Sequence, residues 1–289
     1  MSYIEGLYTQ PPEKFPHDQI LLVGIRGTDV NAYNKDKISE EKKKMVAEIK
    51  EKLKILPNKK CLIVSDIHPY TFIDGYLGLT KYCQYTGITH FCSRVEMNEE
   101  YFELKKILKN VKFVCVPHLI DLTIFKNYGL EKIYDILYYG VDYRQSYPFR
   151  NRLRKLLSSD QCAGLKIRII DRKEKIDGAE LSKYINQSWL TTATPSRFNY
   201  MVKKYFEIPG SYSVVLGSMP NQGLAIYGDN YIHIDETMSD EMIVGIIHKA
   251  LQNKKNLLEK TEKMYHLMHQ NYNISQFKQL LVKKIQENP

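Results

Sequence analysis

Apolar and polar positions along the chain repeat with two periods, one typical of buried strands and one typical of amphipathic helices. The apolar runs "QILLVGIRG" and "KCLIVSDIH", each bounded by turn residues, predict buried strands. Residues 39–55, which lie between them, predict a helix that Ser39 caps, with two acids in the first turn and apolar residues at four-residue spacing. Strands that alternate with helices in this way predict a parallel sheet covered on both faces.

The same alternation restarts after residue 127. Strands are predicted in "KIYDILYYG", "GLKIRIID", "SYSVVLG" and "LAIYGDNYIHID", and helices in "YPFRNRLRKLLSS", "TPSRFNYMVKKYFE" and "SDEMIVGIIHKALQN". Two helical stretches close the chain. We therefore predict an α/β protein with two Rossmann-like domains, residues 1–127 and 128–265, followed by a helical tail, residues 266–289. Two such domains face each other across a cleft in several ligand-binding architectures, and ligands bind at the carboxyl ends of the strands.

Composition adds little to this picture except for charge. The chain has 289 residues, and lysine plus arginine exceeds aspartate plus glutamate by 42 − 33 = 9. A basic chain is compatible with nucleic acid, with phosphorylated small molecules and with peripheral contact to an anionic membrane. The sequence contains no recognised nucleic-acid motif, so we expect no nucleic-acid partner. Five cysteines without a Cys-x-x-Cys pair, no secretory signal and no membrane-spanning apolar run favour a cytoplasmic protein with buried thiols.

Several kinds of site find no support in the sequence. The segments "DIH" and "HID" are single carboxylate–histidine pairs without a third ligand at a recognisable spacing, so we predict no metal site. The absence of a Gly-x-x-x-x-Gly-Lys-Ser/Thr loop disfavours an NTPase, and "GIRGTD" does not match a dinucleotide-binding fingerprint.

One acid occupies an unusual local position in the stretch "KYFEIPGSYSVVLGS". The pattern predicts a helix that opens at Thr194–Pro195 and ends near Glu207, although the negative end of a helix disfavours acids. A salt bridge to a neighbouring lysine or arginine is one explanation, and a ligand contact is the other.

Two longer stretches carry a family resemblance. The segments "VPHLIDLTIFKNYGLEKIYDILYYG" and "TPSRFNYMVKKYFEIPGSYSVVLGS" resemble the interdomain crossover and the donor-site helix and strand of GT-B glycosyltransferases. The "FEIP…G" form is similar to the spore-maturation type among the family-1-like and family-4-like enzymes. The tail resembles the ending of these enzymes, which packs back on the first domain. The resemblance covers roughly residues 111–286.

The resemblance implies a hexosyltransferase of carbohydrate biosynthesis. Its donor would be a UDP- or GDP-sugar, its acceptor a hydroxyl of a glycan or other molecule, and it would need no further cofactor. In this family the acid at the position of Glu207 binds the ribose hydroxyls. Retaining members often carry a second glutamate eight positions earlier, where this chain has Asn199. That departure leaves the usual contact to the donor sugar, and the stereochemical outcome, open.

A diphosphate needs positive charge and free backbone N–H groups. The predicted donor-binding residues are Gly140, Arg144, Arg150, Thr194, Ser196, Arg197, Asn199 and Glu207. The arginines also fit solvent-facing or otherwise paired side chains.

Sugar transfer usually needs a base for the acceptor hydroxyl. Asp66 and His68 follow a predicted strand of the first domain, and either can serve as that base; a capping aspartate and a packed histidine are the alternatives. His118, in the crossover, is predicted to contact the donor or to act as a hinge residue.

Two other functions fit the same sequence. A nucleotide-sugar epimerase of the same fold would bind the same donor and turn it over without an acceptor. A non-catalytic basic module would bind nucleic acid with an affinity that falls steeply with salt.

Overall fold

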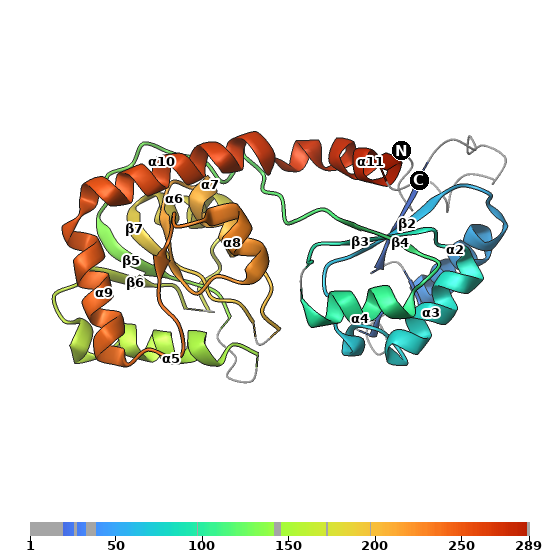
Figure 1. Ribbon diagram of the computed structural model, residues 1–289, viewed down its shortest axis with the longest axis horizontal. Coiled ribbons are helices and arrows are strands. Elements are labelled where there is room, and N and C mark those ends of the chain that lie inside the picture. Colours follow the sequence, from blue (N-terminus) through green and yellow to red (C-terminus); the bar gives the residue numbers. More distant parts are fainter. Residues whose placement is uncertain are drawn as a thin grey trace. The chain divides into compact units, whose positions relative to one another are not determined.

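The computed structural model describes residues 20–25, 28–32, 39–96, 98–141, 146–171, 173–196 and 198–287. The chain forms two α/β units, Met1–Pro117 with Lys278–Pro289 and His118–Phe277 (Figure 1). The sequence placed the boundaries after residues 127 and 265, whereas the structure places them after Pro117 and Phe277.

The first unit contains a parallel sheet of four described strands in the order β1-β2-β3-β4. The strands are β1 Leu21–Gly24, β2 Lys60–Val64, β3 His90–Ser93 and β4 Lys112–Cys115. The helices are α2 Glu40–Ile55, α3 Gly75–Thr86, α4 Glu99–Ile107 and, from Lys278 on, α11 Phe277–Glu287. The return of the last helix to the first unit is thus confirmed, and so is the Ser39 cap of α2, whose hydroxyl accepts from the Lys42 N–H at 3.3 Å. The sequence missed α3.

The second unit contains a parallel sheet of five described strands in the order β6-β5-β7-β8-β9. The strands are β5 Tyr134–Tyr138, β6 Ile167–Ile169, β7 Ser188–Thr192, β8 Val214–Gly217 and β9 Ile232–His233. The helices are α5 Pro148–Leu157, α6 Gly178–Asn186, α7 Lys204–Gly210, α8 Asn221–Tyr227, α9 Asp240–Gln252 and α10 Lys254–Asn271. The predicted α/β class with two parallel sheets is therefore confirmed.

Helices cover both faces of the second sheet, which explains why its strands are apolar at successive positions (Figure 1). Ile136 and Tyr138 of β5 pack in one core with side chains of α5 and α9. Leu137 and its neighbour Tyr139 pack in the other core with side chains of α6, α7, α8 and α10. The carboxyl edge of the sheet is the part left for a ligand.

Two predicted elements are wrong in this unit. The helix expected from Pro195 onward begins only at Lys204, because Asn199 adopts a φ of 51°, which a helix cannot continue through. The strand expected from Leu224 onward is α8 followed by a short β9, separated by Gly228 with a φ of 54°. A short apolar run does not by itself distinguish a strand from a buried helix.

All five cysteines lie in the described ranges, and each is buried as a free thiol. None of the helices in those ranges has the length and apolar character needed to cross a membrane.

Candidate active site

Glu207 lies at the carboxyl edge of the second sheet, in the first turn of α7, and is only 8% exposed. The predicted position at a helix C-terminus is wrong: in a first turn the helix dipole favours an acid. The Tyr139 hydroxyl donates to Glu207 Oε2 at 3.1 Å, and Lys203 Nζ lies 3.1 Å from Oε1. Each carboxylate oxygen thus has one partner, a buried hydroxyl for Oε2 and a half-exposed ammonium for Oε1.

Tyr139 is a permanent donor to this carboxylate. Burial, followed by the charge of Glu207 and the hydrogen bond between the two groups, raises the pKa of the Tyr139 hydroxyl well above its usual value. The phenol therefore stays protonated throughout the physiological pH range and can always donate to Glu207.

A buried lysine supplies positive charge at the carboxyl end of β5. Lys204 is 8% exposed; its ammonium donates to the Tyr139 carbonyl and lies 4.0 Å from the Tyr139 ring centroid. A Cβ on Gly140, whose φ is 91°, would lie 2.8 Å from Lys204 Cε. The conformation and the lack of a side chain at Gly140 are thus both needed for the lysine to approach the strand end. Tyr139 and Lys204 were not among the site residues predicted from the sequence.

Arg150 holds together two loops at the same edge. Its side chain is buried, and it donates from Nη1 to the Val141 carbonyl at 2.8 Å and from Nη2 to the Thr194 carbonyl at 2.7 Å. Its Nε donates to Thr194 Oγ1 at 3.2 Å, and its guanidinium carbon lies 3.9 Å from the Tyr147 ring centroid. The loop after β5 is thereby tied to the loop after β7.

A cavity of about 450 Å³ opens at the carboxyl edge and brings together three of the predicted donor-binding residues, Thr194, Ser196 and Asn199. Its other lining residues are Pro148, Phe149, Pro195, Ser218, Asp235, Glu236 and Thr237. Gly140, Arg150 and Glu207 are not part of this lining. Arg144 and Arg197 lie outside the described residues.

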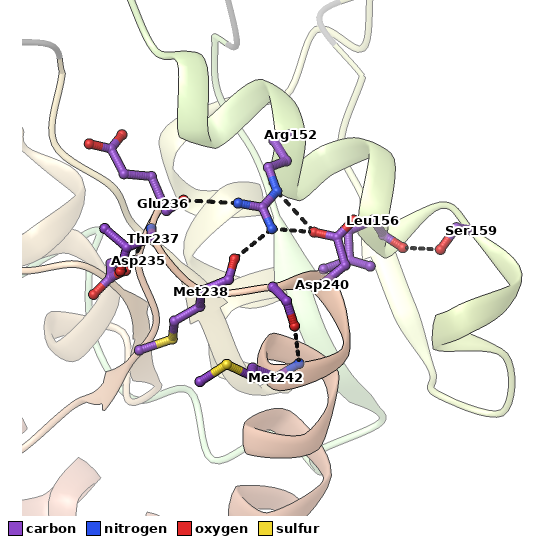
Figure 2. A network of polar contacts seen from close by, with 10 residues as sticks. Arg152, Leu156, Ser159, Asp235, Glu236, Thr237, Met238, Asp240 and Met242 are labelled. Carbon is purple, nitrogen blue, oxygen red and sulfur yellow. Dashed lines mark hydrogen bonds and ion pairs between the residues drawn. The ribbon is translucent and has the colours of Figure 1, made fainter.

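The loop after β9 lines this cavity, and Arg152 of α5 binds the backbone of the loop (Figure 2). The Arg152 guanidinium donates to the Glu236 carbonyl at 3.0 Å, to the Met238 carbonyl at 2.6 Å and to Asp240 Oδ1 at 2.6 Å. From the sequence, this segment was considered only as a carboxylate–histidine metal pair; acids directly after a strand were the signal that could have identified it as part of a site.

The first unit has a smaller cavity of about 260 Å³ at the carboxyl ends of β1 and β2. Asp66 and Thr71 line it, together with Gly24, Ile25, Asn31, Ile63 and Ser65. Thr71 Oγ1 is buried and has no hydrogen-bond partner among the described residues. The cavity therefore offers a carboxylate and an unsatisfied hydroxyl to a polar ligand.

The two predicted histidines lie elsewhere. His68 is 2% exposed, with Nδ1 3.8 Å from Glu100 Oε1 and its ring stacked on Tyr70. His118 is half-buried beside Phe206 of α7, with 6.2 Å between the ring centroids. Over the described part of the chain, no group of three or more His, Cys, Asp or Glu side chains is placed to hold a metal ion.

No family model and no curated protein sequence matches the chain. Several solved structures are similar to it. The pneumococcal O-GlcNAc transferase GtfA, solved with UDP and GlcNAc, is similar over 98% of this chain and 59% of its own, with 11% identity and a TM-score of 0.54. The chain thus spans about three fifths of GtfA.

Two further structures match over more of their own length. The T4 phage β-glucosyltransferase covers 94% of this chain and 82% of its own, with 11% identity and a TM-score of 0.54. Anabaena HepE, solved with UDP-glucose, covers 84% of this chain and 76% of its own, with 9% identity and a TM-score of 0.55. At such identities the likeness shows the fold: the chain has two Rossmann-like α/β units, as in GT-B glycosyltransferases.

Proposed function

We propose that the chain is a glycosyltransferase that moves a sugar from a nucleoside diphosphate sugar to an acceptor hydroxyl without a metal ion. The observation that carries this proposal is the buried, doubly held carboxylate of Glu207 at the carboxyl edge of the second sheet. A carboxylate oxygen has about two lone-pair sites, so each oxygen can still accept one more hydrogen bond. Two neighbouring acceptors suit the 2′- and 3′-hydroxyls of a ribose.

The diphosphate would lie beside Gly140. The glycine makes room for the Lys204 side chain, whose buried ammonium adds positive charge to the end of the strand. Arg144 and Arg197 are the further candidates for the phosphate oxygens, because guanidinium groups bind phosphate in a bidentate manner. The nucleotide would be UDP or GDP.

The acceptor would bind in the 260 Å³ cavity of the first unit, with Asp66 as the base. The base takes the acceptor hydroxyl's proton while the acceptor oxygen bonds to the anomeric carbon. The bond between that carbon and the diphosphate oxygen breaks, and the nucleoside diphosphate leaves. Of the two base candidates we favour Asp66, because it lines the cavity whereas His68 is packed between Tyr70 and Glu100.

Glu207→Gln tests the proposed ribose contact. The change keeps the size of the side chain but removes its charge and one acceptor, so affinity for the nucleoside diphosphate should fall by about 1–3 kcal/mol. The free energy of unfolding should fall less, by about 0.3–1 kcal/mol, because an acid in a first turn is favoured by the helix dipole. Calorimetric titration and urea unfolding of the same variant measure both quantities.

Glu262→Gln is the matched control, because Glu262 also accepts from a tyrosine hydroxyl, that of Tyr212, but on the exposed surface of α10. A 2′,3′-dideoxy nucleoside diphosphate should bind the wild type and Glu207→Gln about equally. If Glu207→Gln loses stability while its affinity for the ribonucleotide stays at the wild-type value, Glu207 is a structural ion-pair residue only.

A further inference from the structure

The 450 Å³ cavity of the second unit has an unusual charge for a protein proposed to bind a diphosphate. Its described lining contains two carboxylates, Asp235 and Glu236, and no lysine, arginine or histidine. The remaining polar groups are hydroxyls and one amide, from Thr194, Ser196, Asn199, Ser218 and Thr237. These described carboxylates, hydroxyls and amide suit a neutral ligand that donates several hydrogen bonds.

The two carboxylates differ in what they can still bind. Asp235 Oδ1 accepts from the Thr237 N–H at 2.8 Å and from its hydroxyl at 2.6 Å, and Oδ2 lies 2.9 Å from His233 Nε2. The carboxylate of Glu236, by contrast, makes no hydrogen bond or ion pair with any described residue and is exposed. Glu236 is therefore the acid that is available to a ligand.

The backbone presents Glu236 in a fixed place. Arg152 binds the carbonyls of Glu236 and Met238, and it binds the Asp240 carboxylate with two nitrogens. In Figure 2 the Glu236 side chain extends away from this guanidinium. Because Arg152 anchors its backbone, this loop loses little backbone freedom when a ligand binds to the Glu236 carboxylate.

We propose that Glu236 binds the hydroxyl groups of the transferred sugar, and that the cavity it shares with Asn199 is the donor-sugar pocket. The proposal rests on the proposed glycosyltransferase function and adds a specificity-determining residue to it. The volume lies in the range of about 300–1,000 Å³ that small-molecule sites occupy. Position 199 contributes an amide here, and the loop after β9 contributes the carboxylate.

The test separates the sugar from the nucleotide. UDP and GDP, and then UDP-glucose, UDP-N-acetylglucosamine and GDP-mannose, are titrated calorimetrically into the full-length wild type and into Glu236→Gln. The variant should bind the preferred nucleotide sugar about 10-fold more weakly, the loss expected for one hydrogen bond to a charged group. Its affinity for the bare nucleoside diphosphate should be unchanged.

Glu259→Gln, an exposed acid on α10, is the matched control and should leave every affinity unchanged. An equal loss for the sugar nucleotide and the bare nucleotide would overturn the proposal, because Glu236 would then contact the nucleoside. No loss for either would overturn it as well. If no nucleotide or nucleotide sugar binds the wild type, the glycosyltransferase function itself fails, which is a different result.

Discussion

Asp66→Asn should lower the rate of sugar transfer by about 10²–10⁴-fold at saturating donor, the range that a general base contributes. An asparagine keeps the shape of the side chain but cannot take the proton of the acceptor hydroxyl. Donor affinity should not change, because Asp66 lies in the first unit and the proposed donor contacts lie in the second. The turnover number and the calorimetric dissociation constant of the donor check the two halves of this prediction.

Two controls make the result specific to Asp66. Asp74→Asn changes an acid in the left-handed conformation, with a φ of 58°, which asparagine also adopts, and it should leave turnover unchanged. His68→Gln tests the other base candidate. If Asp66→Asn retains turnover and His68→Gln loses it, His68 is the base.

Arg150→Ala should destabilise the protein by about 3–5 kcal/mol. Two buried acceptors on Thr194 and one part-buried acceptor, the Val141 carbonyl, would lose their donor, and each buried unsatisfied group costs about 1–3 kcal/mol. Because domains are stable by only about 5–15 kcal/mol, the loss should show as a large shift of the urea midpoint.

Arg152→Ala is the comparison. Its ion pair with Asp240 is partly exposed, and pairs of this kind contribute about 0–1 kcal/mol. The Glu236 and Met238 carbonyls that it also binds are exposed or part-buried, so water can replace the lost donor. The loss of stability in this variant should be clearly smaller. If Arg150→Ala instead keeps the wild-type urea midpoint and binds the nucleoside diphosphate more weakly, Arg150 is a phosphate ligand, as the sequence predicted, and its contacts to the two loops are incidental.

The elements that the sequence predicts correctly are those with local signals. Ser39 and Ser239 cap α2 and α9 because a hydroxyl before an acidic first turn satisfies a free N–H, and this depends on neighbours in the chain alone. The strands are equally readable, since both faces of a parallel sheet are buried and the apolar runs are continuous.

The start of α7 shows where such rules fail. Thr194 followed by Pro195 is a regular helix opening, yet the described residues 194–196 and 198–202 form no helix and α7 begins at Lys204. The Thr194 carbonyl is bound by Arg150, a contact that spans 44 positions of the chain. A long-range contact of this kind has no local sequence signal.

The candidate site likewise contains one residue that the sequence identifies and others that it does not. Glu207 could be singled out from the sequence, but for a reason the structure corrects, because the acid lies in a first turn. The contact of Tyr139 with Glu207 joins residues 68 positions apart, and that of Lys204 with the Tyr139 carbonyl joins residues 65 apart. Both depend on how α7 packs against β5, so neither could be read from residue spacing.

Calorimetric titration of the intact wild-type chain with UDP, GDP, ADP, CDP and dTDP tests the central claim most directly. The claim is that the carboxyl edge of the second sheet binds a nucleoside diphosphate through Glu207 and the groups around Gly140. It predicts that at least one of these nucleotides binds with one-to-one stoichiometry and a dissociation constant of about 1 µM to 1 mM, the usual range for enzyme substrates. The absence of binding by all of them at millimolar concentration, with the protein folded, would contradict the account.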